Sequence, residues 1–87
     1  MPPDDAPDVL ASFGRAVRVL RTERGLSQER LAERAGIHRT YVADVERGRR
    51  NVGLVNVSRL AAALEVDLPT LMAALESARE TVGPGDL

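Results

Sequence analysis

The sequence lacks several residue types on which common functional sites depend. It contains no cysteine, which excludes a disulfide framework and a thiolate metal site. Its single histidine, His38, has no second imidazole with which to share a metal ion. We therefore expect neither a metal ion nor a cofactor.

Long apolar runs and catalytic motifs are missing as well. No run of about 18 apolar residues and no basic leader followed by an apolar segment occurs, so we expect a cytoplasmic protein without a membrane partner. No glycine-rich loop precedes Lys-Ser or Lys-Thr, there is no His-Glu-x-x-His, and no paired carboxylates border an evident cleft. The sequence thus predicts that the protein is not an enzyme, and no pattern indicates a small-molecule ligand.

Charge is distributed unevenly along the 87 residues, although the net charge is only −1. Residues 15–50 hold ten arginines against five acidic residues, a net charge of +5, whereas the two flanking segments each carry −3. All twelve basic residues are arginine, whose planar guanidinium suits phosphate and guanine; codon bias is the alternative explanation. The chain has room for one domain with a modest core, for which dimerisation is a usual source of stability.

Residues 27–50 contain two short helical patterns joined by a turn. The first begins at Ser27, a favourable N-cap, has acidic Glu29 in its first turn, and carries apolar residues on one face, namely Leu31, Ala32 and Ala35. Gly36 ends it, because only glycine enters the left-handed conformation without steric cost. The second pattern runs from about residue 38 to residue 47 and stops at Gly48. Two helices joined by so sharp a turn are typical of a helix-turn-helix.

The second of these helices has two distinct faces when residues are placed at 100° intervals. Val42 and Val45 fall on the inner side. The opposite side lacks large apolar residues and presents Arg39, Thr40, Ala43, Asp44 and Arg47. Side chains of these kinds can address the edges of DNA bases. A helix that only packs could show the same amphipathicity, but the combined spacing of cap, turn and polar strip favours binding.

Together these residues resemble the Cro/C1-type (XRE-like) helix-turn-helix DNA-binding domains. The matching positions are Ser27-Gln28, Leu31-Ala32, Gly36, Val42, Glu46, Gly48 and the segment 60–66, and the resemblance covers roughly residues 13–75. Within that family, Arg39-Thr40-Tyr41 followed by Glu46-Arg47 and Arg50-Asn51 is most similar to the controller proteins of restriction-modification systems. The resemblance implies an all-α, compact five-helix domain of the lambda repressor-like fold, with the helix-turn-helix at helices two and three.

Apolar spacing and capping residues place the remaining helices. We expect a first helix from Asp8, its cap, to about residue 24, a fourth helix over 54–64 with Leu54 facing inward, and a fifth over 68–79. Gly53 is a weak cap for the fourth helix, whereas Asp67 caps the fifth. The domain then spans 8–80, between disordered tails at 1–7 and 81–87.

The resemblance implies that the second motif helix enters the major groove. Arg39 is the first candidate for base contact, because arginine donates two hydrogen bonds to guanine O6 and N7. Thr40 could touch a thymine methyl group or a phosphate, and Ala43 lies on the same strip. Asp44 either accepts a hydrogen bond from the cytosine N4 amino group or is neutralised by Arg47 one turn further on.

Contacts to the phosphate backbone are expected from polar residues around that helix. Gln28 matches a position that the family uses for phosphate contact. His38 is either a cap or a phosphate contact, and Tyr41 either binds a phosphate through its hydroxyl or packs against the turn. The other candidates, for which a solvated loop is the alternative, are Arg47, Arg49, Arg50 and Asn51. The resemblance also suggests an ion pair between Arg21 and Glu46; a solvated Arg21 is the alternative.

Apolar residues crowd the fifth helix, more than the earlier helices can obviously cover. They are Leu68, Leu71, Met72 and Leu75. We expect them to form a subunit interface together with the fourth helix, the alternative being that they close the monomer's own core. The resulting hypothesis is a homodimeric transcriptional regulator that binds a palindromic operator in double-stranded DNA. The alternative is a protein-interaction module of the same fold, antitoxin-like or regulator-binding, that acts through helix five.

Overall fold

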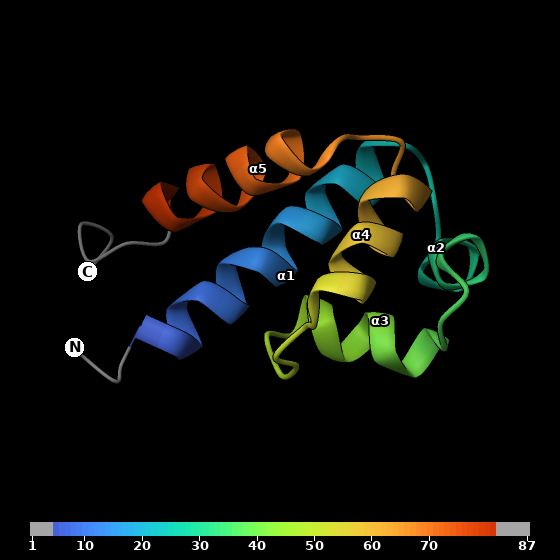
Figure 1. Ribbon diagram of the computed structural model, residues 1–87, viewed down its shortest axis with the longest axis horizontal. Coiled ribbons are helices and arrows are strands. Elements are labelled where there is room, and N and C mark those ends of the chain that lie inside the picture. Colours follow the sequence, from blue (N-terminus) through green and yellow to red (C-terminus); the bar gives the residue numbers. More distant parts are fainter. Residues whose placement is uncertain (1–4, 82–87) are drawn as a thin grey trace.

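The computed structural model describes residues 5–81, and every regular element within that range is a helix. The helices are α1 (Asp5–Glu23), α2 (Gln28–Ala35), α3 (Arg39–Glu46), α4 (Leu54–Ala63) and α5 (Leu68–Thr81). The predicted all-α, five-helix class is confirmed, with α2 and α3 forming the helix-turn-helix. In Figure 1, α5 lies along α1, and α3 packs against α1 from the other side.

The first helix begins earlier than predicted. It starts at Asp5, inside the segment expected to be a tail, and Pro7 does not block it. The first turn of a helix has backbone N–H groups without intrahelical partners, so proline is tolerated there. The prediction that Asp8 is the N-cap of this helix is therefore wrong. Instead its carboxylate lies 3.2 Å from Nε of Arg79 and joins α1 to the last turn of α5.

The two expected tails fall largely outside the described residues. Of the segment 1–7, residues 5–7 are helical, and of the segment 81–87, only Thr81 is described and belongs to α5. The described helices run from residue 5 to residue 81, slightly beyond the predicted domain limits of 8–80.

One apolar core connects all five helices. α1 contributes Phe13, Val17 and Leu20. The large apolar side chains with less than 2% exposure are Val17, Leu31, Val42, Val45, Leu60, Leu64 and Leu71. Burial of this apolar surface is the main source of stability in so small a domain.

The predicted surface position of two α5 residues is wrong. Leu71 is completely buried and Leu75 is only 8% exposed, and both belong to the monomer's own core. The reason is that α1 runs along α5 and covers the face on which these leucines lie. Leu68 and Met72 are 45% and 38% exposed. Leu54, expected to face inward, is 84% exposed; it is the first residue of α4 and lies between the exposed Gly53 and Val55.

Candidate nucleic-acid interface

The turn between α2 and α3 is built from local interactions. The Ser27 side chain accepts a hydrogen bond of 3.0 Å from the backbone N–H of Arg30 and so caps α2. At the other end, Gly36 adopts a left-handed conformation with φ 71°, and the Ile37 N–H donates to the carbonyl of Ala32 at 3.0 Å. The chain then re-enters a helix at Arg39. These short-range bonds set the angle between the two helices.

The position of α3 relative to α1 depends on a close backbone approach. A Cβ atom added at Gly14 would lie 2.2 Å from the carbonyl oxygen of Val45 and 2.8 Å from that of Glu46. Only a residue without a side chain fits between α1 and the last turn of α3. Gly14 therefore determines how deeply the end of α3 sits against α1.

The outer face of α3 differs from the predicted strip at one residue. Val42 and Val45 are buried as expected, and Arg39, Thr40 and Arg47 are exposed. The predicted exposure of Ala43 is wrong, since only 6% of this residue is accessible. It lines a hollow of about 270 Å³ between three helices, together with Arg18, Arg21, Gln28, Glu46 and Arg47. Neighbouring side chains from α1 and α2 shield Ala43, which a wheel of α3 alone cannot show.

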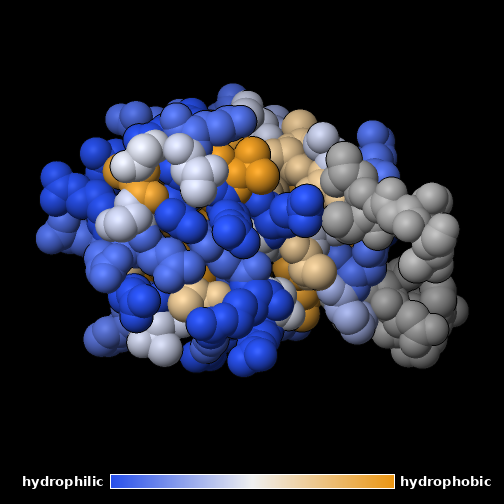
Figure 2. Space-filling model, turned by 180° about the vertical axis from the view of Figure 1, so that it is seen from behind, coloured by the Kyte–Doolittle hydropathy of each residue, from blue (hydrophilic) through white to orange (hydrophobic). Residues whose placement is uncertain are grey.

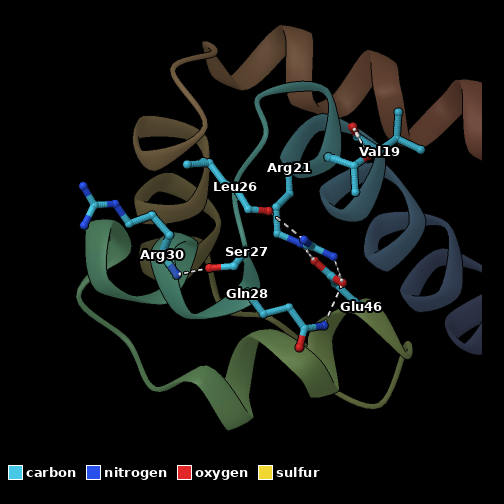
Figure 3. A network of polar contacts seen from close by, with 8 residues as sticks. Val19, Arg21, Leu26, Ser27, Gln28, Arg30 and Glu46 are labelled. Carbon is cyan, nitrogen blue, oxygen red and sulfur yellow. Dashed lines mark hydrogen bonds and ion pairs between the residues drawn. The ribbon is translucent and has the colours of Figure 1, made fainter.

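Arg21 and Glu46 form the suggested ion pair at the centre of this junction (Figure 3). The guanidinium donates to both carboxylate oxygens, from Nε at 2.6 Å and Nη2 at 3.0 Å, and its Nη1 donates to the carbonyl of Leu26 at 2.8 Å. The Gln28 amide nitrogen donates to the same carboxylate at 3.0 Å. The hydrogen bond with Glu46 raises the pKa of Arg21 further above its already high usual value. The network ties α1, the following loop, α2 and α3 together.

Carboxylates accompany the arginines on the outer surface of the motif. Nε of Arg39 lies 3.5 Å from a carboxylate oxygen of Glu29 at the start of α2. One Asp44 oxygen lies 3.4 Å from Nη1 of Arg47, and the other lies 3.8 Å from Nε of Arg50. Of the two interpretations of Asp44, its neutralisation by Arg47 is the one that this geometry matches.

The loop after α3 lies back against α3 itself. The guanidinium of Arg50 sits over the ring of Tyr41, 5.0 Å from its centroid, in a cation–π arrangement. The Tyr41 ring itself packs partly against the core, as the packing interpretation anticipated. The other predicted backbone contacts in and around this loop, His38, Arg49 and Asn51, are exposed, and His38 occupies the N-cap of α3 without a side-chain capping bond.

Arg18 is a functional candidate that the sequence reasoning missed. It is exposed, and it lines the same hollow as Ala43 and Arg47 although it belongs to α1. The available signal was its spacing: Arg18 precedes Arg21 by three residues, nearly one turn, and so shares its face of α1. Among residues 5–81, no group of acidic or histidine side chains is arranged to hold a metal ion. No helix in that range is both long and apolar enough to cross a membrane.

Comparison with known proteins agrees with this geometry. Residues 17–71 match the helix-turn-helix family HTH_3. The control protein C.BamHI of Bacillus amyloliquefaciens is 44% identical over 61 residues, which cover 69% of this chain and 75% of that protein. The restriction-modification controller protein C.AhdI from Aeromonas hydrophila is 53% identical, with a TM-score of 0.70 over 71% of this chain and 94% of that one.

A third relative was solved with nucleic acid bound. The restriction-modification controller protein C.Esp1396I, as a tetramer in complex with its natural 35 base-pair operator, superposes with a TM-score of 0.78 at 26% identity. The match covers 83% of this chain and 95% of that chain. The chain therefore belongs to the helix-turn-helix family of Cro/C1 type, and its relatives there include the controller proteins of restriction-modification systems.

Proposed function

We propose that the protein is a sequence-specific transcriptional regulator that binds a palindromic operator as a homodimer, with α3 in the major groove. The observation that carries the proposal is the exposed outer face of α3. Arg39 and Thr40 project from its first turn, and a hydrogen-bond network holds the helix against α1 and α2. The N-terminal residues of a recognition helix are those that reach base edges. The complex of the C.Esp1396I tetramer with its natural 35 base-pair operator supports operator DNA as the partner.

The polar residues around α3 divide into base contacts and backbone contacts in this proposal. Arg39 contacts guanine and Thr40 contacts a neighbouring base or phosphate. Contacts that position the protein on the backbone come from the surrounding side chains, namely Arg18, Gln28, His38, Tyr41, Arg47, Arg49, Arg50 and Asn51. Ala43 and Asp44, which the sequence placed among the base contacts, have no base-contacting role here, because one is buried and the other faces two arginines.

The homodimer surface is assigned to apolar side chains of α4 and α5. Leu54, Val55, Leu68 and Met72 are large apolar residues that are at least 38% exposed. Met72 and Leu54 border an apolar hollow of about 180 Å³ between α1, α4 and α5. The face drawn in Figure 2 is mostly hydrophilic, with narrow apolar areas. A second copy of the chain is the occupant that a two-fold operator requires.

The names of the relatives support a finer proposal. Control of a restriction-modification system, in the cytoplasm, is the role that the names of C.BamHI and C.AhdI favour for this chain. Protein concentration, acting through dimerisation, would then be the controlling variable. Such a regulator has no catalytic step.

Selection of bound duplexes from a random DNA pool, at roughly 150 mM salt to suppress non-specific phosphate binding, tests the proposal. We expect an enriched palindrome with guanine at matched positions, and the loss of this enrichment in Arg39→Ala/Thr40→Ala. Arg59→Ala, which removes an exposed arginine of α4, is the matched control and should retain the palindrome. If the folded protein enriches no sequence, the regulator proposal fails and the interaction module acting through α5 takes its place.

Sedimentation analysis tests the dimer surface. Leu54→Asn should shift the protein towards the monomer, because the side chain is 84% exposed in the monomer and would be buried by a partner. Val19→Asn changes an apolar side chain of α1 that is 45% exposed and should leave association unchanged. An unchanged dimer in Leu54→Asn would place the interface elsewhere.

A further inference from the structure

We propose that Asp44 is a specificity-determining residue, which restrains Arg47 and Arg50 in the free protein and thereby limits binding to non-operator DNA. This inference rests on the proposed function. Asp44 stands near the middle of α3, and its side chain is 27% exposed. Its two carboxylate oxygens face two different arginines, Arg47 at the C-cap of α3 and Arg50 in the loop beyond it.

The arrangement holds the loop as well as the side chains. The backbone carbonyl of Asp44 accepts the N–H of Arg49 at 2.9 Å, and its side chain approaches Arg50 of the same loop. The Tyr41 ring supports the Arg50 guanidinium from α3. Two side chains of α3, those of Asp44 and Tyr41, therefore restrict the Arg50 guanidinium, and the backbone bond to Arg49 holds the loop that carries it.

Binding to random DNA depends almost entirely on arginine and lysine side chains that neutralise phosphates. On such DNA, an arginine that pairs with Asp44 must leave its carboxylate before it can serve a phosphate, and the carboxylate itself repels the backbone. Both effects weaken complexes that rely on charge alone. The arginine pairs are exposed, with 57% and 51% of the Arg47 and Arg50 side chains accessible, so each effect is modest and reversible.

Asp44 weakens binding to operator DNA less than it weakens binding to random DNA. There the base contacts of Arg39 and Thr40 fix the register of α3, and phosphates arrive at defined positions beside it. Side chains that are already restrained lose less conformational entropy when they bind at those positions. Removing the carboxylate adds charge attraction but also adds side-chain freedom, and the two changes partly cancel. The ratio of operator to random affinity should therefore fall when Asp44 is neutralised.

The test compares the full-length protein with Asp44→Asn by fluorescence anisotropy. The probes are the duplex enriched in the selection described above and a shuffled duplex of the same length and composition, titrated between 100 and 300 mM salt. We expect Asp44→Asn to bind the shuffled duplex about fivefold more tightly, the scale of two exposed ion pairs. The salt dependence should steepen by about one unit of log–log slope, the value of roughly one further neutralised phosphate. The operator affinity should change less, so that the specificity ratio falls at least threefold.

Glu76→Gln is the matched control. Glu76 pairs with Arg79 three residues later at 3.4 Å, the same spacing and distance as Asp44 and Arg47, but on α5. Glu76→Gln removes one negative charge without changing α3 and should leave the ratio of operator to random affinity unchanged. Combining Asp44→Asn with Arg50→Gln should remove a large part of the gain on shuffled DNA, which a purely structural role of Asp44 would not predict.

Two results would overturn the inference while leaving the proposed function intact. An unchanged specificity ratio and salt slope in folded Asp44→Asn would mean that the carboxylate does not restrain the arginines. Weaker operator binding with a changed preference at a single base pair would make Asp44 a base contact instead. If the wild-type protein selects no duplex at all, the proposed function fails, and the inference falls with it.

Discussion

Removal of the Glu46 carboxylate should destabilise the protein strongly. The side chain is 5% exposed and accepts two hydrogen bonds from Arg21, at 2.6 and 3.0 Å, and one from Gln28 at 3.0 Å. In Glu46→Ala the Arg21 guanidinium, itself 12% exposed, keeps only the carbonyl of Leu26 as a partner. A largely buried cation is then left without its counter-charge, which is the costly way to break an ion pair.

The expected loss can be compared with the total stability. Breaking a buried pair by removing one partner costs about 3 to 5 kcal/mol, and we expect the lower end because Arg21 borders a solvent-accessible hollow. A domain of this size has a free energy of unfolding of roughly 4 to 13 kcal/mol. The change is therefore a quarter or more of the total, and Tm should fall by about 12 °C or more. Urea unfolding followed by circular dichroism measures it.

Two further variants distinguish the effect of burial on stability from the effect of charge. Glu33→Ala breaks an ion pair with Arg30 of similar length, 2.8 Å against 2.6 Å, but with side chains that are 61% and 70% exposed. It should change the free energy of unfolding by less than about 0.5 kcal/mol. In the double variant Arg21→Met/Glu46→Leu, the loss should be smaller than in Glu46→Ala, because no buried charge is left unpaired. A Glu46→Ala variant as stable as Glu33→Ala would refute the reasoning.

Three further changes test other parts of the fold. Gly14→Ala should move α3 by about 1 Å, because its Cβ would lie 2.2 Å from the carbonyl oxygen of Val45; we expect a loss of about 1 to 3 kcal/mol in urea unfolding and weaker DNA binding in anisotropy assays. A Gly14→Ala variant with the stability and DNA affinity of the wild-type protein would show that α1 and α3 can separate freely. Gly53→Ser should stabilise the protein by several tenths of a kcal/mol in the same unfolding assay, because α4 has no side-chain cap, and a loss would contradict this. Hydrogen bonds from the Thr70 side chain and backbone N–H lower the pKa of Asp67, so this carboxylate stabilises the fold above about pH 4 and the contribution disappears as pH falls through the lowered pKa. Unfolding titrations from pH 2 to 7 should show this acid-side loss in the wild-type protein but a smaller one in Asp67→Asn.

Local features of the fold were predictable from the sequence. Ser27 determines where α2 begins, and Gly36 and Gly48 determine where α2 and α3 end, because capping and left-handed backbone depend on the residue at that position and its near neighbours. The buried Val42 and Val45 followed from the helical period alone. The Arg21–Glu46 pair joins residues far apart in the chain, and only the resemblance to a family suggested it.

Burial that depends on which helices meet could not be predicted in this way. Periodicity identifies the apolar stripe of α5, but only the path of α1 beside it decided that Leu71 and Leu75 are covered and Met72 is not. Side chains of α1 and α2 likewise closed over Ala43, and the junction of three helices placed Arg18 beside the recognition helix. The sequence by itself determined each helix and its chemistry, whereas the tertiary structure decided which faces remain exposed, since burial is a property of the contact between two surfaces.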